Sequence, residues 1–196
     1  MKKSKCFLVL FTLILVFVKN VNAGEVDWLF GIGMDLGGEK LGTLEWDNGS
    51  SKDIRTHQGI HITLGLDYIL NDNFIIRGDI GYKGDSAGGK EGDVKFTRLP
   101  IELIPFAVLG SHRFGAGGVY HFNSEYSCDI SNSCDFNVEI ENSFGWVVQY
   151  EYKFLISTYN QNFAFGIRYL NINYTPKLAG ATLSGSGVGF RLTALF

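Results

Sequence analysis

The first residues that could do chemistry are two cysteines in an acidic segment. Cys128 and Cys134 lie within 123–143, a stretch rich in carboxylates that contains no lysine or arginine. In an exported chain such a pair predicts a disulfide, and closing so short a loop contributes roughly 2 kcal/mol by the chain-entropy argument. Zinc needs more ligands than this pair offers, and no histidine neighbours it. The carboxylates could bind calcium, but they lack EF-hand spacing, so we interpret the segment as a solvated acidic loop and predict no metal or cofactor.

His121 and Ser124 are the nearest approach to a catalytic base and nucleophile. A lipid-modifying hydrolase needs both groups within reach of each other. A spacing of three places the two side chains on opposite faces of a strand. We therefore interpret His121 as a lumen residue and Ser124 as a loop residue, and predict that the protein is not an enzyme.

The remaining chemistry lies in charged residues that share one parity across several segments of alternating polarity. Cations and anions on this face are nearly balanced, which favours ion pairs in a closed interior over an open pore. An unpaired buried charge would cost several kcal/mol. The predicted lumen network consists of Arg77, Asp79, Arg98, Glu102, Arg113, Glu151, Lys153, Arg168 and Arg191.

Strands must position these charges, because the alternation has a period of two. In the last strand Phe190, Leu192 and Ala194 share one face, while Arg191 and Thr193 share the other. A transmembrane strand needs about 9–11 residues of such alternation. The pattern predicts eight strands, at 26–36, 59–69, 74–83, 94–106, 112–122, 144–155 and 162–173, and at the C-terminus.

The connections between these strands alternate in length. Short turns are expected near Asn71, at Leu109-Gly110 and over 158–161. Short turns on one side and long loops on the other are typical of outer-membrane barrels, and with a periplasmic N-terminus the long loops fall outside the cell. The long connections are 37–58, 84–93, 123–143 and 174–184.

Two arrangements fit this alternation: a membrane barrel, or an exported soluble barrel or sandwich. A soluble barrel would have to fit the apolar face inside, yet that face carries large aromatic residues on strand after strand, too many for an eight-stranded interior. A polar interior and a lipid-facing apolar exterior is the simpler solution. We predict an all-β fold, an eight-stranded antiparallel up-and-down transmembrane β-barrel.

The beginning of the chain predicts export. Lysines at 2, 3 and 5 precede a mostly apolar run over 6–18, which is too short to span a bilayer, and Ala23 ends a small-residue cleavage motif. We expect a signal peptide over 1–23 and one barrel domain over 24–196. The whole chain carries a net charge of −3, and loss of the leader's lysines makes it more acidic. No basic patch indicates nucleic-acid binding.

Two stretches resemble a known family. Arg98-Leu-Pro-Ile-Glu-Leu-Ile-Pro, followed after a turn by Phe114-Gly-Ala-Gly-Gly-Val-Tyr, is similar to the fourth and fifth strands of the outer-membrane β-barrel domain family, the OmpA-like and OmpX-like eight-stranded barrels of the porin-family type. The resemblance implies that Phe196 is the C-terminal signal read by the barrel assembly machinery. Pro105 departs from the family strand and leaves its boundary open. We expect no peptidoglycan-binding domain after the barrel, so the resemblance does not imply that anchoring role.

These observations predict a non-enzymatic protein of the bacterial outer membrane, in contact with membrane lipid and lipopolysaccharide. Its function would lie in surface loops that mediate adhesion or other interactions, or in structural support of the membrane. A small channel or transporter is the alternative, and a lipid-modifying hydrolase is the least favoured. The sequence identifies no surface ligand.

Overall fold

The computed structural model describes residues 25–45, 49–89, 92–131, 134–156, 161–177 and 180–196. The signal peptide expected over 1–23 and most of the turn expected over 158–161 lie outside these ranges. In the described part of the chain, no helix has the length and apolar character needed to cross a membrane.

Strands account for most of the described residues. They are β1 (Val26–Gly37), β2 (Lys40–Glu45), β3 (Ser51–Arg55), β4 (Gly59–Asn71), β5 (Phe74–Gly89), β6 (Gly92–Leu109), β7 (His112–Ile130), β8 (Cys134–Ile140), β9 (Ser143–Ile156), β10 (Gln161–Tyr174), β11 (Leu183–Ser184) and β12 (Gly187–Leu195).

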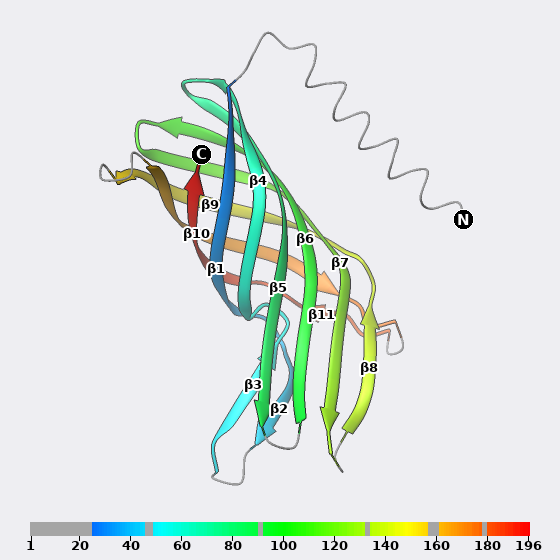
Figure 1. The fold of residues 1–196 in the computed structure, drawn as a ribbon. Coiled ribbons are helices and arrows are strands. Elements are labelled where there is room, and N and C mark those ends of the chain that lie inside the picture. The colour runs from blue at the N-terminus through cyan, green and yellow to red at the C-terminus, as the bar shows by residue number, and fades with distance from the viewer. Residues whose placement is uncertain (1–24, 46–48, 90–91, 132–133, 157–160, 178–179) are drawn as a thin grey trace, which may run out of the picture.

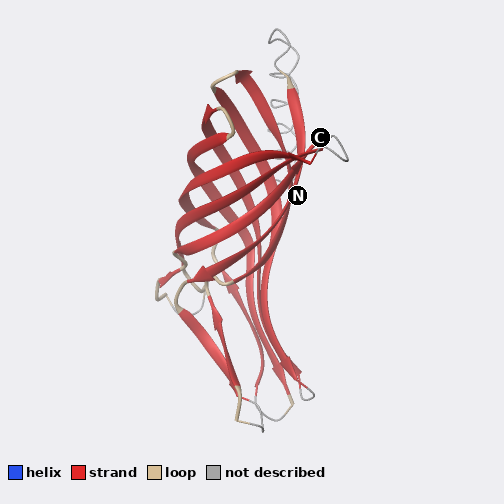
Figure 2. Cartoon of the chain, turned by 90° about the vertical axis from the view of Figure 1, so that its left-hand side faces the viewer, coloured by secondary structure: helices blue, strands red, loops and turns tan. Residues whose placement is uncertain are grey.

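Eight of these strands form a closed barrel. Antiparallel pairing runs β1–β4–β5–β6–β7–β9–β10–β12, and β12 pairs back to β1, where Leu29 faces Leu195. Each barrel strand neighbours the next one along the chain (Figures 1 and 2). The predicted eight-stranded up-and-down barrel is confirmed, and strand closure removes the open edges of the sheet.

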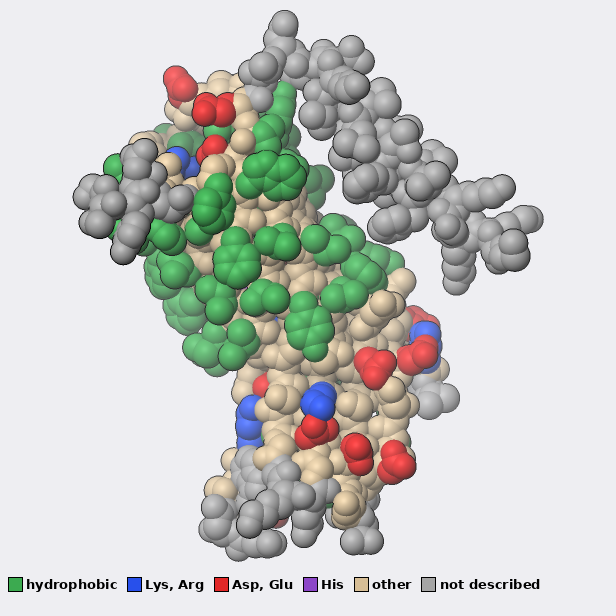
Figure 3. Space-filling model, in the orientation of Figure 1, with side chains coloured by type: hydrophobic (Ala, Val, Ile, Leu, Met, Phe, Trp, Pro, Cys, Tyr) green, Lys and Arg blue, Asp and Glu red, His purple; other side chains and the backbone are tan. Residues whose placement is uncertain are grey.

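The outward face is an apolar belt, and the inward face is polar. On β9, Trp146 and Tyr152 are exposed, whereas Gln149 and Glu151 between them are buried. Apolar side chains cover the upper half of the molecule in Figure 3, and polar and charged groups dominate below them. This polarity is opposite to that of a soluble barrel and confirms the predicted inside–outside assignment.

The two ends of the barrel differ. The end that holds the C-terminus and the turn between Asn71 and Phe74, here the turn end, joins β4 to β5 and β6 to β7 by two-residue connections. At the other, here the hairpin end, β5, β6, β7 and β8 continue beyond the belt as a four-stranded sheet (Figure 2). The predictions of loops at 84–93 and 123–143 are therefore wrong in part. Outside lipid these strands lack the alternation of large apolar residues that revealed the others.

The β2–β3 hairpin packs on the inner side of this extension. Ile54 of β3 is fully buried in an apolar cluster with Ala87, Val94 and Phe96. Lys52 pairs with Asp85 at 3.3 Å and donates a hydrogen bond to the carbonyl of Ser86. The long connection 37–58 is thus an ordered hairpin in most of its described residues.

A β-bulge at Asn123 changes the facing of β7. Asn123 has φ of 49°, and the register with β6 shifts between Thr97 and Leu99. One extra residue on β7 reverses the parity beyond it. As a result His121 and Ser124 are both buried, and the prediction that they lie on opposite faces is wrong.

Candidate functional site

The inward charges form three clusters along the barrel axis. The cluster nearest the turn end is centred on Arg77, which donates hydrogen bonds from Nε and Nη2 to Asp67 at 2.7 and 2.9 Å and also pairs with Glu151. Arg113 binds Asp67 at 3.0 Å, and the amide of Gln149 donates to Glu151 at 2.7 Å. This arrangement neutralises two arginines with two carboxylates from different strands.

The middle cluster joins four charged residues around the lumen. Arg191 donates to Asp79 at 2.9 Å and to Glu102 at 3.3 Å. Arg168 donates to the other oxygen of Glu102 at 2.6 Å. Bonds across the barrel between β5, β6, β10 and β12 cross-link the wall from inside, as the predicted network requires.

The outer cluster lies toward the hairpin end and gathers three of the four histidines of the chain. Asp35 pairs with Lys83, and its Oδ2 is 3.2 Å from His61 Nδ1. His121 Nδ1 lies 2.6 Å from the hydroxyl of Tyr174. Asp35 and Lys83 are not among the nine residues of the predicted network, although both have the inward parity of their strands, which is the signal that could have identified them.

Segment 56–58, here the mouth segment, enters the barrel on the hairpin-end side of the outer cluster. His57 is fully buried, 3.5 Å from Lys83 Nζ and 3.9 Å from Asp35. A Cβ at Gly187 would come within 2.2 Å of the His57 ring, so this close approach requires glycine. Burial and the charge of Lys83 lower the pKa of His57 to about 3, which keeps its imidazole neutral.

Arg98, a member of the predicted network, binds backbone rather than a carboxylate. Its Nη2 donates to the backbone carbonyls of His57 and Gln58 at 3.1 and 2.9 Å. Its guanidinium also lies 4.3 Å from the ring centroid of Phe96. Arg98 therefore fixes the mouth segment in the barrel, where it replaces the solvent that the segment's carbonyls would otherwise contact.

The lumen between the middle and outer clusters is filled. The enclosed cavity there has a volume of about 10 Å³ and is lined by charged side chains including Lys83, Glu102 and Arg168. That space matches a single water molecule. Buried apolar side chains flank the charges on both sides. Phe96 and Tyr174 lie toward the hairpin end, and Phe106 lies toward the turn end. This geometry favours a sealed interior.

Two predicted site residues lie apart from the network. Lys153 shares the inward parity but is only partly buried near the turn end, and it makes none of the ion pairs found among the described residues. Cys128 and Cys134 are joined by a disulfide between β7 and β8, with Cα atoms 5.8 Å apart. Cys128 is buried in the apolar cluster, so the disulfide belongs to the strand ladder and not to a solvated loop tip.

The buried His121 and Ser124 are poorly placed for catalysis on a membrane lipid. Both side chains lie inside the barrel wall, and His121 is engaged by Tyr174. Among the residues that the structure describes, no group of three or more His, Cys, Asp or Glu side chains could hold a metal ion.

The closed ring, the apolar belt and the charged lumen define a transmembrane β-barrel of the bacterial outer-membrane class. No family model and no curated protein sequence matches the chain. Solved structures do match. OprG from Pseudomonas aeruginosa, an outer membrane protein, has a TM-score of 0.53 at 12% identity over 88% of this chain and 97% of that one.

Two further structures of the same kind are similar over the same share of the chain. Neisserial surface protein A gives a TM-score of 0.49 at 12% identity, over 87% of this chain and 97% of that one. Ail, the attachment invasion locus protein of Yersinia pestis, gives 0.48 at 12% identity, over 88% of this chain and 99% of that one. At 12% identity the likeness to OprG supports the fold alone, and function must be argued from this chain's own residues.

Proposed function

We propose that the protein is a non-enzymatic outer-membrane barrel that presents its hairpin end outside the cell as an interaction surface. One observation carries this proposal. The lumen is filled by paired charges, while beyond the belt the chain builds an ordered, disulfide-bonded sheet that the membrane does not require. Ordering this sheet costs conformational entropy, and a sheet ordered in advance spares a binding partner that cost.

The proposal includes the finer expectations from the sequence. Residues 1–23 direct export, the barrel assembly machinery reads Phe196, and the belt contacts membrane lipid and lipopolysaccharide. In support, Phe196 is 65% exposed on the outward face and exchanges backbone hydrogen bonds with Trp28 of β1 at 2.8 and 3.1 Å. The residue is thus both accessible and part of the barrel seam.

The orientation and the sealed lumen are tested together. Asn137 on β8 is exposed, so Asn137→Cys should react with a membrane-impermeant maleimide on intact cells. The matched variant Asn73→Cys, in the exposed turn between β4 and β5, should react only after the outer membrane is opened. Purified protein in planar bilayers should show no conductance above that of lipid alone. Stable conductance steps would instead support the channel alternative.

The interaction role needs its own measurement. Bacteria expressing the full chain should adhere to cultured cell monolayers more than cells expressing a variant with 126–136 replaced by a two-residue turn. Both proteins should reach the membrane in equal amount, as judged by heat-modifiable migration on gels. Equal adhesion of the two strains would contradict a binding role for the β7–β8 hairpin and leave structural support of the membrane.

A further inference from the structure

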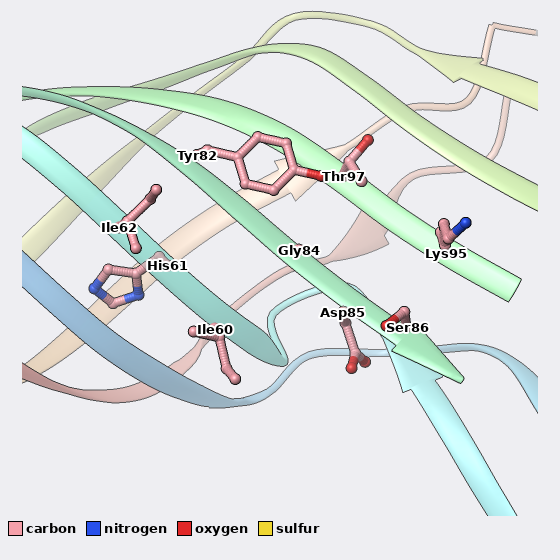
Figure 4. A pocket seen from close by; sticks show the side chains of 9 residues that line it. All are labelled: Ile60, His61, Ile62, Tyr82, Gly84, Asp85, Ser86, Lys95 and Thr97. Carbon is pink, nitrogen blue, oxygen red and sulfur yellow. The ribbon is translucent and has the colours of Figure 1, made fainter. Parts of the chain in front are cut away.

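A hollow of about 310 Å³ lies on the outer face of β4, β5 and β6, at the level where the belt ends (Figure 4). In the strand registers Gly84 faces Ile60 of β4 on one side and Thr97 of β6 on the other. Because Gly84 has no side chain, this row of three outward positions is empty at its centre. A Cβ there would meet only the ring of Tyr82, at 3.5 Å, so no neighbour fills the space.

The hollow spans the change from apolar to polar surface. Along β5 the outward residues Ile80 and Tyr82 are about half exposed, and Gly84 and Ser86 follow toward the hairpin end. Figure 4 shows the isoleucines of β4 on one side of the hollow and Lys95 of β6 on the other. Its wall on the belt side therefore suits an acyl chain, and its rim on the hairpin-end side suits a polar headgroup.

The rim toward the hairpin end carries one exposed lysine. The side chain of Lys95 is 49% exposed and pairs with Asp93, which raises the pKa of the lysine and keeps it charged. Lys95 faces Ser86 in the β5–β6 register, and the ammonium group of Lys52 binds the carbonyl of that serine. Lys52 reaches this carbonyl from the inner side of the extension, where it pairs with Asp85, so Lys95 is the lysine that lines the apolar hollow at the membrane boundary, on a chain whose net charge is negative.

We propose that this hollow binds one phosphorylated glycolipid of the outer leaflet, a lipopolysaccharide, with an acyl chain over Ile60, Ile62 and Tyr82 and a phosphate at Lys95. Neither half suffices alone. Exposed apolar surface is general in the belt, whereas a lysine at a membrane surface attracts any anion. The identity of the leaflet rests on the orientation proposed above; the combination of acyl chain and phosphate does not.

The test measures lipid retention by the purified full chain in detergent micelles, using native mass spectrometry with diphosphoryl lipid A and with the same lipid after removal of its phosphates. Wild type should retain one diphosphoryl lipid A and release the dephosphorylated form. Lys95→Ala should weaken retention about fivefold, the typical effect of one lysine at an anionic surface. Gly84→Leu, which fills the hollow without a backbone clash, should weaken it at least as much.

Two matched variants serve as controls. Lys177→Ala removes another exposed lysine that pairs with one carboxylate, Glu139, away from the hollow. Gly78→Leu adds the same side chain on the same strand, where a Cβ has no neighbour within 4 Å. Both should bind like wild type, and Lys95→Arg should restore retention. Heat-modifiable migration reports folding for every variant.

Several outcomes would overturn the proposal. Equal retention of the dephosphorylated lipid, or wild-type retention by Lys95→Ala and Gly84→Leu, would remove the site. Complete competition by millimolar inorganic phosphate would show a simple anion site without an acyl component. Because the assay uses micelles, its failure is distinct from failure of the maleimide test of orientation.

Discussion

At the residue scale, the barrel interior depends on arginines that share carboxylates. Parity predicted one shared face for the nine network residues, and eight of them are buried. The partners could not be predicted, because contacts across the lumen depend on strand tilt and stagger that the alternation does not encode. Arg77 thus pairs with Asp67 and Glu151, and Arg98 pairs with backbone carbonyls.

Glu102 tests the network most directly, because it is the carboxylate that binds Arg168. Glu102→Leu should leave Arg168 as an uncompensated buried charge and lower the free energy of unfolding by about 3–5 kcal/mol. Urea unfolding in lipid vesicles measures this. Glu139→Gln, which breaks an exposed pair with Lys177, should cause no measurable change. A Glu102→Leu barrel as stable as wild type would show that the lumen is hydrated and its charges screened.

His57 should make stability depend on pH. Its folded-state pKa of about 3 is below the ordinary value of 6.5, so folding favours the neutral imidazole. The stabilisation is complete above pH 6.5 and declines by about 1.4 kcal/mol per unit as pH falls toward 3. The charged groups that act on this ring are Lys83, Asp35, Arg98 and Arg168, of which Lys83 and Asp35 lie within 4 Å of it.

The experiment compares unfolding free energies of wild type and His57→Gln at pH 7.5 and pH 5. Between these values wild type should lose about 2 kcal/mol more than the variant. His61 and His121 are present in both proteins, so the difference isolates His57. Identical pH dependence would mean that His57 leaves the barrel freely and is solvated.

At the element scale, prediction succeeded where lipid imposes a pattern and failed where it does not. For the seven barrel strands that were predicted with bounds, the predicted start lies within two residues of the observed start, because apolar alternation marks the belt. The extensions of β5 and β7 face water and the β2–β3 hairpin, so small and polar residues such as Ser86 and Ser127 suffice there. The alternation of apolar and polar residues around Asn123 did not reveal the bulge from the sequence.

The disulfide belongs to this extension. Replacing Cys128 and Cys134 with alanine should leave the barrel heat-modifiable, because the belt strands do not depend on the β7–β8 hairpin. Protease cleavage within 123–143 should increase, as mapped by mass spectrometry of the fragments. Alanine avoids placing a serine hydroxyl in the apolar cluster around Cys128. Loss of barrel folding in the double variant, or labelling of free thiols on intact cells without reductant, would refute this assignment.

At the scale of the whole molecule, one closed ring of strands has an apolar outer surface and a charged inner surface. Large aromatics such as Trp28 and Phe144 face outward and are mostly exposed, while arginines are among the most buried side chains. The sequence predicted this inversion because too many aromatics share one parity to fit inside. It could not predict that a hairpin and the mouth segment close the barrel, since their contacts join residues far apart in the chain.

Deleting Phe196 should impair assembly and leave the protein in the periplasm. The deletion removes an exposed aromatic and the backbone pairing with Trp28 at the seam. Fractionation with heat-modifiable gel migration measures the effect, and Phe196→Tyr, which keeps an aromatic end, should assemble normally. Wild-type amounts of folded membrane protein after the deletion would remove any role for this residue as an assembly signal.

The pairing of β1 with β12 also dictates an order of events in biogenesis. Leu29 of β1 pairs with Leu195 of β12, so the first strand gains this neighbour only when the last strand is present. The ring therefore cannot close while the chain is still being exported. Contacts of such long sequence separation form slowly. Until they form, β1 and β12 expose unpaired edges that can pair with other chains. The unfolded chain must therefore be kept apart from its copies in transit, and folding is completed only where the last strand is delivered.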